Sequence, residues 1–530
     1  MSDRPTTISH DEALWQPPVN PWIIALVVTM ATFMEVLDTS VANVALPHIA
    51  GSLSAGVDES TWVLTSYLVS NAVVLPLSGW LSERVGRKRF YMSCVALFTV
   101  SSLLCGLAPN LETLVFFRVL QGVGGGGLQP SEQAILADTF PPAKRGMAFA
   151  IYGMAVVAAP ALGPTLGGWI TDNFTWRWIF FINLPVGILS LLLTSRLISD
   201  PPYLKARKHA GVKIDYIGFA LVAIGLGFLQ VVLDKGQRAD WFETPYLRVF
   251  TAIFVTALIL AVVWELRVKN PVVDIRLFKD RTFLMGNVML FMVGFALYSS
   301  TVMLPQFTQV LMGYTAEQSG LVITPRGITI MVLMPLVGFL VTHYDARKLI
   351  AAGFAVVALS LFNMTRFNLQ IDFATMVWAS VLQAVGIAFL FVPINTAAYA
   401  HLPREKSNAA SGLINLSRNI GGSVGISFVT TMLARRAQFH QTVLVSHINS
   451  YDANVASATH TLVGAFTSAG ATAWTATQQA YGALNQLVLQ QANLQAFVDN
   501  FWLLGVSLLA MIPAVFLMKK STPGGAIAVH

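Results

Sequence analysis

Long apolar runs separated by short polar connections make up most of the 530-residue chain. About fourteen of these runs are long enough, at roughly 17–25 residues, to cross about 30 Å of hydrocarbon. Lipid offers no hydrogen-bond partners to the backbone, so each run is predicted to be a helix. The predicted spans are residues 22–46, 61–82, 90–107, 113–137, 147–170, 178–197, 215–234, 248–266, 284–312, 319–342, 348–366, 374–399, 408–433 and 500–518. An even number of spans places both chain termini on the same side of the membrane.

Lysine and arginine residues indicate which side that is. With the N-terminus inside, the cytoplasmic loops and tails hold about 23 of these residues and the opposite face holds about 7, as the positive-inside rule predicts. Both termini are therefore expected in the cytoplasm. The net charge of +7 follows from this orientation and is typical of contact with anionic lipid headgroups rather than with nucleic acid.

The composition agrees with a membrane protein and excludes several other classes. Only 11% of the residues are charged and 55% are hydrophobic, whereas soluble domains carry about 25% charged residues. Cys94 and Cys105 would lie about 16 Å apart along one helix, too far for a disulfide. Neither they nor the histidines form a metal-ligand pattern, so we expect no metal and no cofactor. The acidic N-terminus does not resemble a signal peptide, and no cleaved segment is expected.

One connection is much longer than the others. Residues 434–497, between the last two spans, are rich in Ala, Gln, Thr and Ser and would face outward. Within them, residues 473–496 show apolar side chains at helical spacing, which predicts a small helical hairpin outside the membrane. The segment is either a tolerated insertion or a docking surface for a partner.

A similarity between two loops of the chain predicts a duplicated architecture. Residues 79–89 follow the second span and residues 338–348 follow the tenth, and both stretches begin with glycine and end in a basic pair. This spacing fits two six-helix halves with two extra helices between them. The predicted parts are an N-terminal tail (1–21), an N-terminal six-helix bundle (22–198), two extra helices with their linkers (199–282), a C-terminal bundle that includes the outward loop (283–519) and a C-terminal tail (520–530).

Four motifs occur in the first half. They are LDTSVANVALP at 37–47, GWLSERVGRKR at 79–89, RVLQGVG at 118–124, and Gly153 followed by PALGPTLGG at 160–168. Together they resemble the signature of the fourteen-helix drug:proton antiporters of the major facilitator superfamily, and the long outward loop resembles the EmrB-like branch. One position departs from the pattern, because Glu83 stands where the family usually has aspartate.

The resemblance implies an all-α membrane protein with the major facilitator fold and fourteen transmembrane helices arranged 6+2+6. It implies a transporter rather than an enzyme: a multidrug efflux antiporter of the inner membrane that exports amphipathic or cationic compounds by alternating access. The proton gradient would drive it without a cofactor. Its partners would be a periplasmic adaptor protein and an outer-membrane channel. The alternative is a dedicated exporter of one metabolite, fatty acid or siderophore.

Acidic residues inside the spans are the candidates for proton coupling. Asp38 lies about 12 Å inside the outer end of the first span at Pro47, where an unpaired charge costs several kcal/mol and marks a function by default. Glu35 lies one turn further in. Arg118, at a depth comparable with Asp38, is its expected partner. The pair either opens with proton occupancy or is a static bridge between two helices.

Glu132 is the third intramembrane acid of the first half. It lies on nearly the same helical face as Arg118 if the span 113–137 is one helix, and much nearer the cytoplasm. It is either a second proton or cation site or, as its position favours, an acid that reaches to the membrane edge. The spans of the second half contain no acid, so the proton carrier is expected in the first half.

The loop motif predicts a cytoplasmic latch. Its glycines allow a tight turn and close backbone approach, while its charged side chains can bridge helix ends and separate when that side opens. The latch residues are Gly79, Glu83, Arg84, Gly86, Arg87 and Lys88.

Small residues and prolines in the fifth span predict close helix packing and a bend. These residues are Gly153, Pro160, Gly163, Pro164, Gly167 and Gly168, and the family resemblance associates them with antiport. Candidates for the substrate cavity, chosen by depth alone, are Met34, Gln121, Asn415 and Arg418. Arg418 and Arg326 are the intramembrane charges of the second half.

Overall fold

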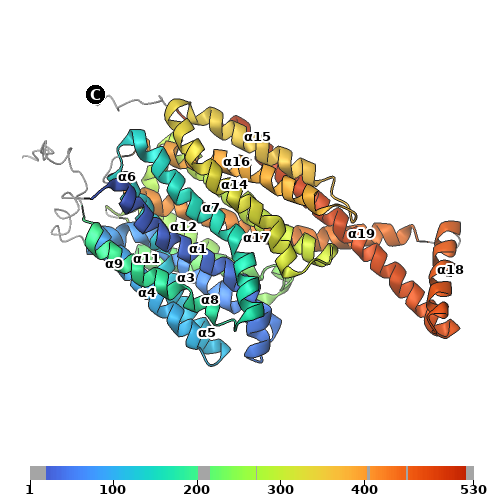
Figure 1. Ribbon diagram of the computed structural model, residues 1–530. Coiled ribbons are helices and arrows are strands. Elements are labelled where there is room, and N and C mark those ends of the chain that lie inside the picture. Colours follow the sequence, from blue (N-terminus) through green and yellow to red (C-terminus); the bar gives the residue numbers. More distant parts are fainter. Residues whose placement is uncertain are drawn as a thin grey trace, which may run out of the picture.

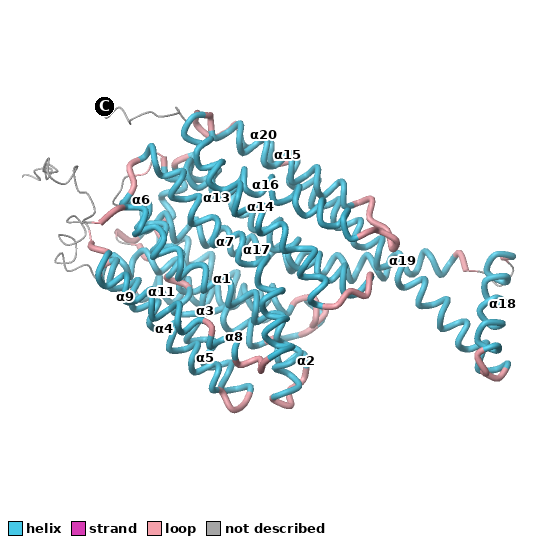
Figure 2. Tube along the Cα trace, in the orientation of Figure 1, coloured by secondary structure: helices cyan, strands magenta, loops and turns pink. Residues whose placement is uncertain are grey.

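The computed structural model describes residues 19–200, 215–269, 271–400, 402, 406–448 and 452–520, and within these the chain forms helices and no strand. Most of the predicted tails, 1–21 and 520–530, and the linker residues 201–214 lie outside the described residues. The helices run side by side in one elongated bundle, with short loops joining them (Figures 1 and 2).

The first half contains the following helices: α1 (Pro21–Ser52), α2 (Val57–Ser60), α3 (Trp62–Val85), α4 (Arg87–Leu107), α5 (Leu111–Gly125), α6 (Leu128–Thr139), α7 (Pro142–Asn173), α8 (Trp178–Phe181) and α9 (Asn183–Leu197). Two further helices, α11 (Tyr216–Lys235) and α12 (Pro245–Arg267), pack against each other, and α11 also contacts α3. These two helices lie in the segment, 199–282, in which the extra pair is predicted.

The second half follows with another set of helices: α13 (Arg281–Gln306), a π-helical turn (Phe307–Leu311), α14 (Ala316–His343), α15 (Ala346–Met364), α16 (Phe373–Tyr399), α17 (Ser407–Ser446), α18 (Ala453–Ser468), α19 (Ala473–Leu509) and α20 (Met511–Val515). The two halves meet along two seams, where α7 packs against α14 and α3 packs against α17.

Each predicted span falls on a helix or on a pair of broken helices. In the described residues, 11 helices are long and apolar enough to cross a membrane, or up to 12 if the bent α7 is one span. Large apolar side chains such as Leu26, Val332 and Trp378 are more than 60% exposed, which suits a surface that faces lipid. The protein is therefore a multi-pass membrane protein.

The span predicted at 113–137 is not one continuous helix. It breaks between α5, which ends at Gly125, and α6, which begins at Leu128. The glycines at the break allow close contacts with neighbours, because a Cβ on Gly126 would lie 2.7 Å from the Asn71 carbonyl oxygen. The prediction that Arg118 and Glu132 share one helical face is therefore wrong, since they belong to separate helices.

The outward segment 434–497 is helical over most of its length, as predicted, but it is not an independent loop. Helix α17 continues beyond the predicted end of its span at 433 to Ser446, and α19 runs without interruption from Ala473 into the last span. Figure 1 shows α18 and the start of α19 projecting well beyond the rest of the bundle. At the base of this projection, Asp499 of α19 accepts hydrogen bonds from Arg436 at 2.6 Å and from His440 at 2.7 Å.

Glycines bring the paired helices of the second half into backbone contact. On α17, a Cβ on Gly421 would lie 2.0 Å from the Phe291 carbonyl oxygen of α13, and one on Gly425 would lie 2.5 Å from the Phe295 carbonyl oxygen. Such close approach increases van der Waals contact between helices in lipid, where no hydrophobic force drives their association. These glycines therefore set the separation of α13 and α17.

We predict that Gly421→Ala destabilises the protein, because the added methyl group forces α17 away from α13. Overpacking of this kind typically costs about 1–3 kcal/mol. The midpoint of thermal unfolding in detergent should fall relative to the unchanged protein. Gly464→Ala in α18 is the matched control, since a Cβ there meets nothing within 4 Å. Equal midpoints for the two variants would contradict the packing argument.

Candidate functional site

A buried ion pair between α1 and α5 lies at the centre of the first half. Arg118 Nη1 lies 2.6 Å from Asp38 Oδ2, and the two side chains are 0% and 1% exposed. The other carboxylate oxygen, Asp38 Oδ1, accepts hydrogen bonds from Gln121 Nε2 at 3.1 Å and from Asn183 Nδ2 at 2.7 Å. The predicted pair of Asp38 and Arg118, which lie at similar depths in their spans, is thus confirmed. Two amide side chains that were not predicted as partners also bond Asp38.

The guanidinium of Arg118 has further partners. It donates from Nε to the Val63 carbonyl oxygen at 2.9 Å and from Nη1 to Gln121 Oε1 at 2.8 Å. It also lies 4.3 Å from the centre of the Tyr67 ring, a cation–π contact. Removing one partner of such a buried pair leaves an unpaired charge, which costs about 3–5 kcal/mol. Any step that neutralises Asp38 therefore acts directly on four helices: α1, α3, α5 and α9.

Glu35 occupies a second buried polar cluster beside the first. Tyr67 Oη donates to Glu35 Oε1 at 2.9 Å, and Asn71 Nδ2 donates to the same oxygen at 3.3 Å. Gln129 Nε2 donates to the other oxygen at 2.6 Å. Tyr67 joins the two clusters, because its ring faces Arg118 while its hydroxyl bonds Glu35. Asp38 and Glu35 thus belong to one connected arrangement.

Glu132 does not reach the membrane edge, and the interpretation that favoured this position is wrong. Its side chain is 0% exposed, and Thr29 of α1 donates to its Oε1 at 2.5 Å. Every residue of α6 is buried, so this helix presents no face along which an acid could extend to the surface. Glu132 is instead a third carboxylate in the interior, with Oε2 lacking a hydrogen-bond partner among the described residues.

The Glu35 cluster continues across the boundary between the two halves. Gln129, which bonds Glu35, also accepts a hydrogen bond from Arg418 Nη2 of α17. Arg418 Nη1 donates to Tyr152 Oη at 3.0 Å, and Tyr152 in turn donates to Asn415 Oδ1 at 3.0 Å. We call the connected side chains from Asp38 to Arg418 the polar chain, and its members are Asp38, Arg118, Tyr67, Glu35, Gln129, Arg418, Tyr152 and Asn415.

A second set of amides holds the same boundary. Asn415 Nδ2 donates to Gln133 Oε1 at 2.8 Å, and Gln133 Nε2 donates to Asn395 Oδ1 at 3.3 Å. Tyr399 also donates to Gln133 Oε1 at 3.3 Å. Gln129 and Gln133 were not predicted as site residues, although an amide inside an apolar span was a signal that could have found both.

The four cavity candidates fall into different surroundings. Asn415 and Arg418 lie at the boundary of the halves, in the polar chain. Gln121 bonds both members of the Asp38–Arg118 pair. Met34 is 2% exposed and packs in the large hydrophobic core. The depth of a residue within its span therefore does not predict which of these surroundings its side chain occupies.

The loop motif joins three elements at one end of the bundle. Arg87 forms an ion pair with Asp138 at the end of α6 and donates to the Ala134 carbonyl oxygen at 3.1 Å. The backbone N–H of Lys88 donates to Asp200 Oδ1 at 2.8 Å. Gly86 adopts φ +97, a left-handed conformation that favours glycine. The partner acids Asp138 and Asp200 were not predicted.

Other parts of the motif also have definite positions. A Cβ on Gly79 would lie 2.9 Å from the Asn408 carbonyl oxygen, so this glycine permits the contact between α3 and α17. Arg84 lies 6.0 Å from the centre of the Trp80 ring. The side chain of Glu83 lies outside the described residues.

The glycines and prolines of α7 connect both halves. Gly163 and Gly167 pack against Ser40 and Val41 of α1, directly after Asp38. Gly153 packs on the other half, against Met334 and Phe391. Helix α7 bends by 45° between its parts Lys144–Pro160 and Leu162–Asn173. Of the remaining motif residues, Pro160 accepts a hydrogen bond from Ser40, Pro164 lies within the helix, and a Cβ on Gly168 would meet nothing within 4 Å.

Within the described residues, no group of His, Cys, Asp and Glu side chains could hold a metal ion. The intramembrane carboxylates are instead bonded to amides, hydroxyls and Arg118.

Comparisons with known proteins identify the family of the chain. Residues 28–426 match the family model of the Major Facilitator Superfamily. The multidrug export protein EmrB of Escherichia coli strain K12 is 36% identical over 511 residues, which cover 96% of this chain and 98% of that protein. The fatty acid resistance protein FarB of Neisseria gonorrhoeae is 39% identical over 505 residues, covering 95% and 97%.

A solved structure shows the same fold. A double-tryptophan mutant of XylE superimposes with a TM-score of 0.60 at 13% sequence identity, over 94% of this chain and 96% of that one. At this identity the likeness concerns the fold alone. On the matched family model and the long, nearly full-length relatives, the chain belongs to the major facilitator superfamily.

Proposed function

We propose that this protein is a proton-coupled antiporter that exports amphipathic organic compounds, cationic ones among them, by alternating access. The observation that carries the proposal is the buried Asp38–Arg118 pair and its connection to Arg418 in the opposite half. The names of the nearly full-length relatives, a multidrug export protein and a fatty acid resistance protein, support export of small amphipathic molecules.

Protonation of Asp38 is the proposed coupling step. A proton on the carboxylate removes its charge and weakens its attraction to Arg118, whose guanidinium then needs another arrangement of partners. Arg118 contacts the Tyr67 ring, and Tyr67 bonds Glu35, so the change reaches Gln129 and Arg418 through the polar chain. The contacts between the halves would thereby depend on proton occupancy, which is the linkage that alternating access requires.

The loop motif is the proposed cytoplasmic latch. The Arg87–Asp138 pair and the Gly79–Asn408 approach hold helix ends together on the side that the positive-inside rule assigns to the cytoplasm. Opening toward the cytoplasm would separate α3 from α17 at Gly79. In this proposal the latch residues bind no substrate.

The proposed topology has fourteen membrane spans arranged 6+2+6, with both termini in the cytoplasm of an inner membrane. Eleven or twelve of the helices meet the length and hydropathy expected of a span. We include the broken α5–α6 pair and α17 as spans, because each lies in sequence between spans that must alternate direction. Residues 22–198 and 283–519 form the two bundles, and residues 199–282 contain the extra helices.

The projecting helices α18 and α19 are the proposed docking surface for a periplasmic adaptor protein that leads to an outer-membrane channel. Two exposed aromatic side chains, Trp474 at 75% and Tyr481 at 57%, belong to the start of α19, which projects beyond the rest of the bundle (Figure 1). Aromatic residues are enriched at protein interfaces.

A dedicated exporter of one acidic compound is the second candidate. The relation to a fatty acid resistance protein over nearly the whole chain favours it. A panel of cationic, neutral and acidic compounds separates the two, because a dedicated exporter transports only one of these classes.

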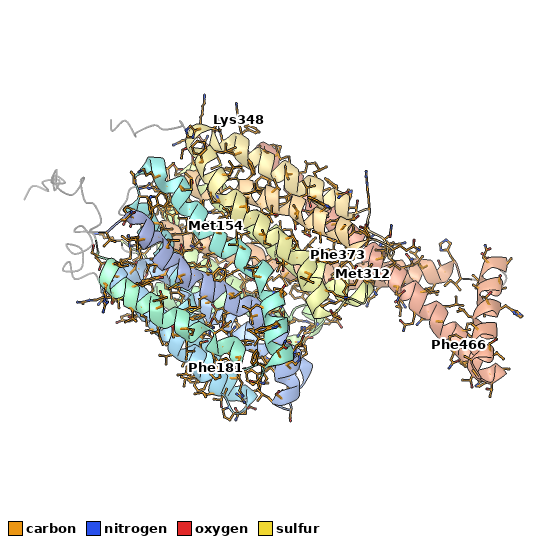
Figure 3. The ribbon with its side chains drawn as sticks, in the orientation of Figure 1. Met154, Phe181, Met312, Lys348, Phe373 and Phe466 are labelled. Atoms are coloured by element: carbon orange, nitrogen blue, oxygen red, sulfur yellow. The ribbon has the colours of Figure 1, made fainter. Side chains whose placement is uncertain are left out.

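We predict opposite labelling of cysteines placed at the two ends of the molecule. Figure 3 shows Lys348 and Phe466 at opposite ends, and both Lys348 and Ser468 have exposed side chains. In intact cells with a permeabilised outer membrane, a membrane-impermeant maleimide should label Ser468→Cys and spare Lys348→Cys. The native Cys94 and Cys105 are buried and supply the background control. Labelling of Lys348→Cys alone would show that the orientation in the membrane is the reverse of the proposed one.

We predict that Asp38→Asn abolishes uphill export, because an amide cannot bind and release the coupling proton. The assay is transport in proteoliposomes under an imposed pH gradient, with the compound panel. One pH unit supplies about 1.4 kcal/mol per proton, so the unchanged protein should build up about a tenfold gradient of substrate per proton. Glu112→Gln, which neutralises an exposed acid at the start of α5, is the matched control and should transport normally.

Uphill export by Asp38→Asn would show that the proton assignment is wrong. Arg118→Ala is informative beside it, because loss of the guanidinium should also stop proton-driven transport. Full transport by Arg118→Ala would indicate that the ion pair takes no part in coupling.

A further inference from the structure

Arg326 is a buried guanidinium for which the described residues offer no hydrogen-bond partner at either terminal nitrogen. Its side chain is 2% exposed in α14, and both Nη1 and Nη2 are unsatisfied. Arg418, the other intramembrane charge of this half, bonds Tyr152 and Gln129. An unpaired charge at this depth is costly, so it marks a functional position by default.

Gln383 of α16 is in the same situation, because it is 0% exposed and neither Oε1 nor Nε2 has a partner among the described residues. Its helix runs beside α14. Ser380 donates to the Val322 carbonyl oxygen at 3.3 Å, and further along both helices Met334 and Phe391 pack against the same glycine, Gly153.

These two contacts align the helices. Val322 is level with Ser380, and Met334 is level with Phe391, so α14 and α16 advance together in the same direction. Arg326 lies one turn beyond Val322 and Gln383 lies about one turn beyond Ser380. The four unsatisfied polar atoms therefore belong to one layer of the second half.

This layer lies next to the boundary between the halves. Thr324, two positions before Arg326, bonds Thr165 of α7 at 2.9 Å, and the bend in α7 at Pro160–Leu162 falls at nearly the same level. Above and below Arg326 on α14, Ile323 and Ile330 are buried. The layer thus combines charged and amide donors with buried apolar side chains, at the level where α14 contacts α7.

Among the described residues, the helices of the second half supply no negative charge for Arg326. Helices α13, α15, α16 and α17 contain no Asp or Glu, and neither does α14 from Gln318 onward. In the first half, Asp38 and Glu35 are already bonded to Arg118, Gln129 and other donors. Glu132 of α6 is bonded by Thr29 of α1. Helix α7, which packs against α14, carries one acid, Asp172, and its side chain is exposed. A counter-charge must therefore come from a molecule that enters the site.

We propose that Arg326 and Gln383 bind the anionic headgroup of an amphipathic substrate, a carboxylate being the best match. A guanidinium donates two parallel hydrogen bonds to a carboxylate, and the isoleucines accommodate an apolar body. This inference rests on the proposed export function and names the residues that would bind its acidic substrates. An elongated aromatic or aliphatic acid fits, whereas a cation would be repelled by Arg326.

Equilibrium binding to the purified full-length protein in detergent tests the site without a proton gradient. The probes are 2-naphthoate, its neutral amide, and the cationic 1-naphthylmethylammonium. The unchanged protein should bind naphthoate about tenfold more tightly than the amide, since a hydrogen bond to a charged group is worth more than a neutral one. Arg326→Gln should remove this preference and should not weaken binding of the cation, and Gln383→Leu should reduce the preference partly.

Arg366→Gln is the matched control, because it removes an exposed guanidinium from the connection between α15 and α16. It should bind all three probes as the unchanged protein does. Arg326→Gln could fail to elute as a folded protein. In that case the proposal is tested by the preference of the unchanged protein for naphthoate over the amide. Arg326→Lys is then expected to keep most of this preference.

Equal affinity of the unchanged protein for naphthoate and the amide would overturn the proposal. So would an equal loss of all three probes in folded Arg326→Gln, which would make Arg326 a structural residue. If naphthoate binds as predicted but proteoliposomes move no compound uphill, the export function fails while the anion site stands.

Discussion

The arrangement of the whole molecule depends on one constraint: an unpaired charge inside a membrane protein is costly. Asp38 and Arg118 satisfy each other across 2.6 Å and add amide, carbonyl and aromatic contacts from two more helices. Because a buried pair is costly to break from one side, the proposed mechanism has its protonation state affect the positions of all the helices that contact it. The same rule explains why the intramembrane charges of this chain are so few and so informative.

Short polar contacts connect the Asp38–Arg118 pair to both halves of the molecule. Tyr67 bonds Glu35 while facing Arg118, and Gln129 bonds Glu35 while accepting from Arg418. Around this chain, glycines bring α7 onto α1 and α3 onto α17. Tight packing of this kind has discrete alternatives rather than gradual ones, which suits a protein that must close one side before it opens the other.

Much of this structure could be predicted from the sequence, and the exceptions have physical causes. The spans could be predicted from hydropathy, because hydropathy depends on local composition. The Asp38–Arg118 pair could be predicted from the similar depths of the two residues within their spans. Glu132 was misplaced because the helical phase is meaningful only within one helix, and the glycines at 125–127 end α5. The sequence did not predict that α19 continues into the last span. The polar first part of this helix and its apolar last part differ in composition, although the backbone is helical throughout.

Long-range partners were beyond the reach of a single sequence. Asp138 and Asp200 lie far along the chain from the basic residues they bond, and Arg418 meets Gln129 from the opposite half. No periodicity relates such positions. Arg326 was visible as an intramembrane charge, but only the structure shows that it lacks a protein partner within the described residues.

Proton release on substrate binding is the measurement that tests the central claim most directly. Purified protein in weakly buffered detergent solution, at a pH where transport occurs, is mixed with a transported compound while the pH is recorded. If Asp38 exchanges its proton for substrate, the unchanged protein releases protons and Asp38→Asn, binding the same compound, releases fewer by about one per molecule. Equal release from both proteins would contradict the account.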